Sequence, residues 1–362
     1  MNAFSSLNGM GMAGGWPVAQ VMAGASAVPL GHAVDLAFFF ERQDDSRQDA
    51  LIVEARRHLA GCVHAIEMAL RLSLSHAPSV AAALDRLEPS LCWAMIRLQP
   101  ELLSPSLLAH MRLRAAITLM LRQQGRGAGD AGLHSVADHA AADADTPSLE
   151  AAAGLALAEG RWLMPGGEDR PMRPDLPVEH YAELVWTVAA CLALAVRRGG
   201  AEDGGVAYAA LERSGWALLA DHDESASPIA LADDLVRQLG EGAGAPDLLG
   251  RALEEQRFLL FAALAARRLH MDSGQVAEIL LLGPVGDVAL LCHALGGSDA
   301  EHRRLLLWLR PVRPSLSDTL MLEQVERHAA VTGPQADEAL ALWRTPVAFR
   351  AKLTHLRGVT PA

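Results

Sequence analysis

The sequence predicts an all-α fold, an array of short antiparallel helices that forms either a HEAT-like α-solenoid or an irregular helical bundle in two lobes. The composition is 51% hydrophobic but only 4% aromatic, because most of the apolar residues are Ala and Leu, which are strong helix formers. Val and Ile do not form the alternating runs that strands need. Apolar side chains instead recur at spacings of three and four residues, as on one face of a helix.

The first predicted helix covers residues 49–75, with Asp49 as its cap and Pro78 as its stop. One face of this helix carries the apolar residues Ile52, Ala55, Leu59, Cys62, Val63, Ile66, Leu70 and Leu74. The charged residues Arg56, Arg57, Glu67 and Arg71 lie largely off that face, so we expect them to meet solvent. Prolines then separate three shorter helices, predicted at 78–87, 89–97 and 105–121.

The remaining helices are predicted at 148–164, 178–198, 206–221, 230–239, 246–269, 274–282, 284–295, 299–309, 317–331 and 334–356. Asp272 and Ser273 are placed to cap the helix that follows them. Ser298 with Glu301 matches the capping-box pattern, in which each side chain bonds to the other residue's backbone.

Breaks in this pattern predict four regions. Residues 1–34 contain no Asp, Glu, Lys or Arg and several Gly and Pro, so we expect a flexible uncharged tail rather than a secretory signal. Residues 35–123 form an N-terminal helical lobe, residues 124–147 a Gly/Ala/Asp-rich linker or loop, and residues 148–357 a C-terminal helical lobe.

Charge and cysteine usage narrow the functional classes. The formal net charge is −12, which disfavours a protein that grips a phosphate backbone, so no nucleic-acid partner is expected. No uninterrupted apolar run reaches the roughly 20 residues of a membrane span. The four cysteines, Cys62, Cys92, Cys191 and Cys292, are far apart in apolar stretches, which predicts small buried thiols in a reducing cytoplasm.

Two stretches of the sequence carry distinctive helix-packing phrases. The first comprises residues 84–91 and 98–108, where a helix ends in an acid-containing turn before a phrase rich in Leu, Ser and Pro. The second comprises residues 249–253, 258–265, 272–276 and 290–296, and together the two span about residues 50–310. These stretches resemble the DUF2336 family of bacterial proteins. The resemblance implies a HEAT-like helical fold and an alphaproteobacterial source, but no catalytic residue. Cys92 to Met95 depart from the smaller apolar residues that are usual there.

No stretch carries a recognisable catalytic or cofactor motif. A glycine-rich phosphate loop after a strand, GxSxG and HExxH are all absent. Histidines near acids occur at His134 to His139 and around His222, but a metal site needs ordered ligands with supporting contacts, and solvated turns are the simpler interpretation. We therefore predict no catalytic residue, cofactor or metal ligand, although an enzyme is not excluded.

Two features are candidate surfaces for a protein partner. Arg56, Arg57, Arg71, Arg112 and Arg114 form a possible basic strip on the first lobe, with solvated ion pairs as the alternative. Trp16, in the uncharged tail, is a possible docking anchor because Trp is enriched at interface hot spots. The other tryptophans are expected mostly in the core.

These observations predict a non-enzymatic helical-repeat protein that binds a protein partner or acts as a regulatory scaffold. The alternative is a small-molecule sensor or enzyme with a pocket between the lobes, near His293 and the helix of Phe258 and Phe261. The oligomeric state does not follow from the sequence.

Overall fold

The computed structural model describes residues 50–125, 146–164, 166–199, 204–346, 349, 350, 352, 353 and 356. All regular secondary structure within these residues is helical, which confirms the all-α prediction. The predicted tail 1–34, with Trp16, and nearly all of the predicted linker 124–147 lie outside the described residues.

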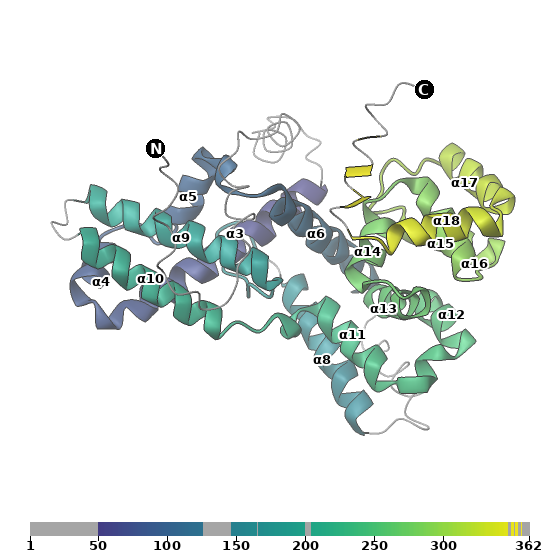
Figure 1. The fold of residues 1–362 in the computed structure, drawn as a ribbon, viewed down its shortest axis with the longest axis horizontal. Helices are drawn as coiled ribbons and strands as arrows, with labels where there is room; N and C mark the ends of the chain where they lie inside the picture. Colours follow the sequence, from purple (N-terminus) through teal and green to yellow (C-terminus); the bar gives the residue numbers. More distant parts are fainter. Residues whose placement is uncertain are drawn as a thin grey trace, which may run out of the picture.

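One lobe of the molecule, the first lobe, lies on the left in Figure 1. Its helices are α3 (Ala50–Ser73), α4 (Pro78–Leu84), α5 (Leu91–Leu98), α9 (Val178–Arg198) and α10 (Gly204–Ala220). A short 3-10 turn, η1 (Leu74–His76), joins α3 to α4, and a second one, η2 (Pro100–Leu102), follows α5. These helices enclose a continuous apolar core to which α3 and α9 contribute most of the side chains.

The second lobe contains α8 (Thr146–Leu163), α11 (Pro228–Gln238), α12 (Pro246–Glu254), α13 (Phe258–Leu269), α14 (Ser273–Leu281), α15 (Val285–Ala294), α16 (Asp299–Leu309), α17 (Asp318–Ala330) and α18 (Gly333–Trp343), with η3 (Glu224–Ala226) and η4 (Gly240–Gly244). From α13 to α17 each helix packs on the next one in the chain, and α15 also contacts α18. Its core centres on α13, whose side chains are buried from Phe258 to Ala266.

Helix α6 (Pro105–Gly125) belongs to both lobes (Figure 1). Leu107, Leu108 and Met111 near its start lie in the first core, and Ile117 and Met120 near its end lie in the second. The lobes therefore do not divide as the sequence predicts, at residues 124–147. The chain enters the second lobe with α8, returns for α9 and α10, and leaves the first lobe again before α11.

Helix α3 is buried on most sides, not on one stripe as the sequence predicts. It contacts α5, α6, α9 and α10, and even Arg57, His58 and Glu67 are buried. Gly61 lets a further, non-helical segment approach α3, because a Cβ there would lie 2.5 Å from Met172 Cγ. The non-helical segment 166–177 lies against α3 at this point, and the Met172 amide donates to the Gly61 carbonyl (2.9 Å).

The helix predicted over 246–269 is two helices, α12 and α13. The break follows from Gln256, which adopts the left-handed conformation with φ of 58°. The Arg257 amide bonds to the Ala252 carbonyl (2.9 Å) and the Gln256 amide to Leu253 (3.3 Å), which is the Schellman ending of a helix. Glycine usually occupies this position, so the sequence contains no conventional signal for the break.

The caps predicted at Asp272 and Ser298 are confirmed, whereas Ser273 is the first residue of α14 and Asp49 lies outside the described residues. The Asp272 side chain accepts from the Gln275 amide, and Ser298 with Glu301 forms the complete capping box of α16. The helix predicted over 334–356 is interrupted, however, because α18 ends at Trp343, and residues 349, 350, 352, 353 and 356 are helical again. Pro346 disfavours helical geometry in the residue before it, which accounts for the early end.

Helix α9 is the one helix among the described residues that is long and apolar enough to cross a membrane. Most of its apolar stretch is buried inside the structure, where it packs against α3, α5 and α10. The apolar side chains of α9 thus pack in the core of the first lobe. No clear membrane span is present in the described part of the chain.

Candidate functional site

The densest group of polar side chains in the interior lies where the two lobes meet, around Arg114 of α6. Arg114 is 1% exposed and pairs with Asp175 through Nη1 (2.8 Å). Its Nε donates to His58 Nδ1 (2.7 Å) and its Nη2 to the Arg173 carbonyl (3.1 Å). Its guanidinium also lies 4.6 Å from the centre of the Trp162 ring, within cation–π range. We call this group, with Glu54, the junction cluster.

Asp175 and Trp162 complete the pairing of this buried charge. The Asp175 carboxylate is 2% exposed and accepts a hydrogen bond from the Trp162 indole as well as from Arg114. A buried ion is tolerated only when it is paired and its remaining polar atoms are bonded. The contacts among Trp162, Arg114 and Asp175 therefore hold α8, α6 and segment 166–177 together.

Glu54 forms the second half of the junction cluster. Its carboxylate accepts from Arg57 Nε (2.9 Å) and from both terminal nitrogens of Arg122 (2.8 and 2.9 Å). Burial by itself raises the pKa of Glu54, but hydrogen bonds from His58 and Arg57 outweigh it and lower this pKa to about 2. The carboxylate is therefore ionised at neutral pH.

His58 next to Glu54 and Thr118 has the residue types of a hydrolase triad, but not its hydrogen bonding. Arg114 donates to Nδ1, so the ring proton of neutral His58 must be on Nε2, which faces Glu54 (3.1 Å) and the Thr118 hydroxyl oxygen (3.0 Å). A general base would need to accept the Thr118 proton at that atom. Thr118 instead donates to the Arg114 carbonyl (3.0 Å), so the hydroxyl is not activated.

Burial also keeps His58 neutral. The ring is fully buried, and desolvation, together with the neighbouring charges of Arg114 and Arg57, lowers the pKa of His58 to about 3 although Glu54 acts in the opposite direction. The junction cluster is thus a closed set of matched charges that holds the lobes together rather than a reaction centre.

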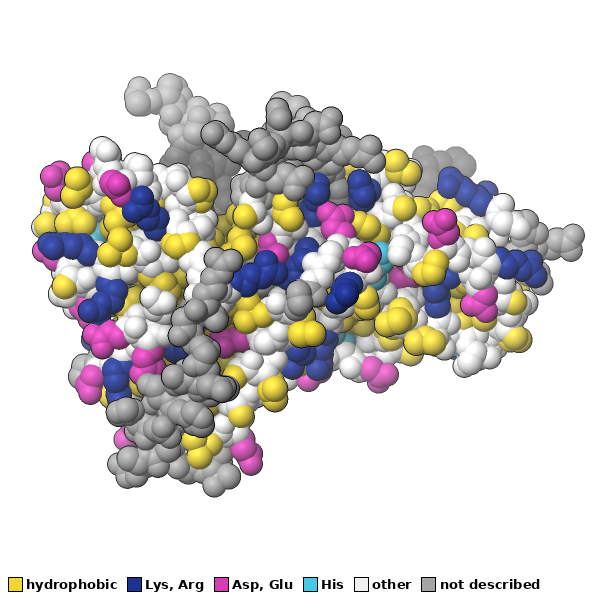
Figure 2. Space-filling view, turned by 180° about the vertical axis from the view of Figure 1, so that it is seen from behind, with side chains coloured by type: hydrophobic (Ala, Val, Ile, Leu, Met, Phe, Trp, Pro, Cys, Tyr) yellow, Lys and Arg dark blue, Asp and Glu magenta, His cyan; other side chains and the backbone are white. Residues whose placement is uncertain are grey.

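The predicted basic strip does not assemble on the surface. Arg57 and Arg114 are buried in the junction cluster, where a partner cannot reach them. Arg56 pairs with Glu168 (3.1 Å), and Arg112 is half-buried on α6. On the face shown in Figure 2, basic and acidic side chains are interspersed with apolar ones rather than separated.

Arg71 has a structural role as well. It pairs with the buried Glu67 carboxylate (2.7 Å) and donates to the carbonyls of Leu84 (2.7 Å) and Glu88 (2.9 Å). The Leu84 carbonyl belongs to the last turn of α4, whose carbonyls lack helical partners. Arg71 therefore joins α3 to the end of α4, and most of its donors are already used.

The four cysteines are free and buried, as the sequence predicts. Burial raises the pKa of Cys62 to about 11 and that of Cys292 to about 12. Since the thiolate is the reactive form, these thiols are poor nucleophiles in the folded protein.

His222 and its acidic neighbours do not form a cation site. The His222 ring stacks on Tyr181 with centroids 3.8 Å apart, and its Nε2 bonds to the Leu176 carbonyl (2.8 Å). Asp223 accepts from Ser225 instead. No group of metal-binding side chains is found among the described residues, and the set around His134 lies outside them.

Tryptophan burial agrees in part with the sequence. Trp93, Trp162, Trp308 and Trp343 are core residues. Trp216 of α10 is 52% exposed and contacts Trp186 of α9 edge to face, with ring centroids 5.0 Å apart. Trp216 lies on the exposed side of α10, where most residues are exposed, whereas Trp186 belongs to the well-buried α9.

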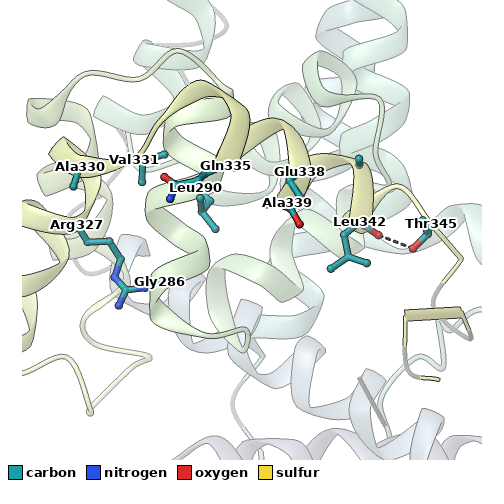
Figure 3. A pocket seen from close by; sticks show the side chains of 11 residues that line it. Gly286, Leu290, Arg327, Ala330, Val331, Gln335, Glu338, Ala339, Leu342 and Thr345 are labelled. Carbon is teal, nitrogen blue, oxygen red and sulfur yellow. Dashed lines mark hydrogen bonds between the residues drawn. The ribbon is translucent and has the colours of Figure 1, made fainter. Parts of the chain in front are cut away.

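An open groove in the second lobe is a further candidate site (Figure 3). Its volume is about 680 Å³, in the range of ligand-binding clefts. Helices α15, α17 and α18 line it with Gly286, Leu290, Arg327, Ala330, Val331, Gln335, Glu338, Ala339, Ala341 and Leu342, followed by Thr345. We call it the α15–α18 groove.

The charged side chains of this groove are separated along its length. Figure 3 shows Arg327 at one end, beside Gly286, and Glu338 farther along α18 toward Thr345. Gly286 lets Arg327 lie against α15, because a Cβ there would be 2.7 Å from Arg327 Nη1. Sequence reasoning missed this site, since its walls come from three helices and no single segment carries a recognisable motif.

Comparison with known proteins adds no relative: no family model, curated protein or solved structure matches this chain. The resemblance to the DUF2336 family stays a prediction.

Replacing Arg114 tests the junction cluster. Arg114→Met leaves the buried Asp175 carboxylate without its cation, so we expect a loss of about 3–5 kcal/mol in the free energy of unfolding, measured with urea. Adding Asp175→Asn should recover part of that loss. Arg122→Met is the matched control: its side chain is 38% exposed, and we expect a loss of about 1 kcal/mol or less. Equal effects of the two single variants would contradict this role.

Acid should weaken the fold through His58. Its pKa in the folded protein is below the ordinary value of 6.5, so only the unfolded chain takes up this proton as the pH falls from 6.5 toward 3. At pH 5 we expect a loss of about 2 kcal/mol from this group. Glu54 adds to this loss, because its pKa is also lower in the folded protein, but only below pH 4.5.

The measurement is urea unfolding of wild type and His58→Gln between pH 7 and 5. The variant should show the shallower pH dependence. An identical slope in both proteins would show that His58 does not stay neutral in the fold.

Proposed function

We propose that this chain is a non-enzymatic interaction protein that binds an amphipathic helix of a protein partner in the α15–α18 groove. The observation that carries the proposal is the groove itself, which combines volume, an apolar lining and exposed charges. Helix-in-groove recognition uses this combination, with apolar side chains at three- and four-residue spacing inserted between helices.

The dimensions favour a short helix as the occupant. Helix α18 has 11 residues, so its wall extends about 16 Å, or three helical turns. Small side chains at Ala330, Ala339 and Ala341 allow another backbone to approach. Arg327 and Glu338 are both exposed, and complementary charges set orientation more than affinity. The partner helix would therefore carry an acidic residue toward Arg327 and a basic residue toward Glu338.

The order of packing in the second lobe supports a repeat-like architecture. Consecutive helices from α13 to α17 contact one another, as in α-solenoids, where each unit packs on its neighbours and leaves extended faces for partners. We propose a HEAT-like arrangement for this lobe on that basis. Bacterial origin and membership of the DUF2336 family follow only from the resemblance.

Charge and cysteine chemistry support the other parts of the proposal. The net charge of −12 and the mixed charges on the face in Figure 2 disfavour a nucleic-acid partner. Free buried thiols suit a reducing cytoplasm. The junction cluster offers no activated nucleophile, which favours binding over catalysis.

A pocket between the lobes, the alternative from the sequence, receives less support. The α15–α18 groove lies within the second lobe, as does a smaller cavity of about 330 Å³ beside α11 and α13. Between the lobes, the junction cluster fills the space around Arg114 with paired side chains.

Site-specific photo-crosslinking tests the docking proposal. A benzophenone side chain at Ala341, which lines the groove, should crosslink to one recurring amphipathic helical segment in cells, identified by mass spectrometry. The matched probe at Ala329 is exposed on α17 but does not line the groove. It should not capture that segment.

Blocking the groove provides the second readout. Ala330→Arg places a long side chain in the groove and should abolish the crosslink from Ala341, whereas Ala329→Arg on the same helix should preserve it. Crosslinks that are the same from both probe positions, or that survive Ala330→Arg, would refute helix docking in the groove.

A further inference from the structure

A second, smaller pocket in the second lobe combines an apolar interior with two opposite charges at its rim. It has a volume of about 160 Å³ and lies among α12, α13, α15 and α16. Its buried lining consists of Leu253, Phe261, Cys292, Leu295 and Leu305. Arg268 is exposed and Glu301 is half-buried, so the charged groups are at the solvent side.

The two carboxylate oxygens of Glu301 have different roles. Oε2 accepts from the Ser298 amide and hydroxyl (both 2.7 Å) in the α16 capping box. Oε1 faces Gly250, since a Cβ built on Gly250 would lie 3.9 Å from it. The hydrogen bonds from Ser298, and more weakly the charges of Arg304 and then Arg268, lower the pKa of Glu301, so the rim presents a carboxylate at neutral pH.

The size of the interior limits the ligand to one small apolar group. A cavity of about 150 Å³ lined by Leu, Ile and Phe is large enough to bind benzene. Clefts for drug-sized molecules begin at about 300 Å³. The pocket therefore fits a phenyl or branched aliphatic group. The part of the ligand that extends out of the pocket would contact the guanidinium of Arg268 and the carboxylate of Glu301.

We propose that this pocket binds a free α-amino acid with an apolar side chain, such as leucine or phenylalanine. The side chain occupies the interior, the α-carboxylate pairs with Arg268 and the ammonium group pairs with Glu301 Oε1. Charge-assisted hydrogen bonds of this kind are about twice as strong as neutral ones, and the exposed position of the rim keeps the desolvation cost small. This site is independent of the α15–α18 groove.

The binding experiment uses the full chain and isothermal titration calorimetry with L-leucine and L-phenylalanine. Three analogues of leucine separate the contributions of its charged groups and its stereochemistry to the affinity. 4-Methylpentanoate lacks the ammonium group, isopentylamine lacks the carboxylate, and D-leucine has the opposite configuration at the α-carbon. We expect each analogue to bind at least tenfold more weakly than L-leucine. Absence of binding by both amino acids at millimolar concentration would overturn the proposal, as would equal binding of 4-methylpentanoate or isopentylamine.

Gly250 offers a variant that fills the pocket without disturbing the fold. Gly250 is inside α12 and lines the pocket, so Gly250→Leu places its side chain there, and replacing a helical glycine favours the helix. Gly250→Ala is the matched control, because its Cβ meets only Glu301 Oε1 at 3.9 Å. We expect Gly250→Leu to abolish leucine binding and Gly250→Ala to change it less than threefold.

Arg268→Gln tests the charge at the rim. This substitution should weaken the binding of L-leucine and of 4-methylpentanoate at least fivefold and leave the affinity for isopentylamine unchanged. If Gly250→Leu or Arg268→Gln bound L-leucine like the wild type, the amino acid would not occupy this pocket in the proposed way.

Discussion

The structure depends on one buried charge, the Arg114 guanidinium, at the meeting point of the two lobes. A buried guanidinium cannot be left unpaired without a large cost in free energy, so its partners are fixed relative to it. These partners come from α3, α8 and segment 166–177, which are far apart in the sequence. Because α6 contributes apolar side chains to both cores, this pairing sets how the lobes are joined.

The same constraint determines where function can reside. His58, Thr118 and Glu54 would be a reactive set if a ligand could reach them, but Arg114 occupies the acceptor nitrogen of His58 and every member is buried. The polar side chains of the junction cluster are therefore all engaged in contacts that stabilise the fold. In the second lobe, helices that pack on their neighbours leave concave surfaces, and both the α15–α18 groove and the pocket beside α16 occur there.

Local features were predictable from the sequence because they depend on neighbouring residues. The helices and the Ser298–Glu301 capping box are of this kind. Arg57 and Arg114 were expected at the surface because helical periodicity cannot distinguish a side chain facing solvent from one facing a buried carboxylate on another element. The return of α9 and α10 to the first lobe depends likewise on distant contacts, and the break at Gln256 lacks the usual glycine. The α15–α18 groove and the pocket beside α16 each combine several helices, which no single segment reveals.

Hydrogen exchange at the Met172 amide is the most direct test of this account. Segment 166–177 contains no helix, yet its Met172 amide bonds to Gly61 of α3 (2.9 Å) and its Asp175 pairs with Arg114. If the junction cluster builds this segment into the core, the Met172 amide exchanges as slowly as the amides of α3 and opens only with the fold. Exchange at the rate of an unstructured loop would contradict the central role of Arg114.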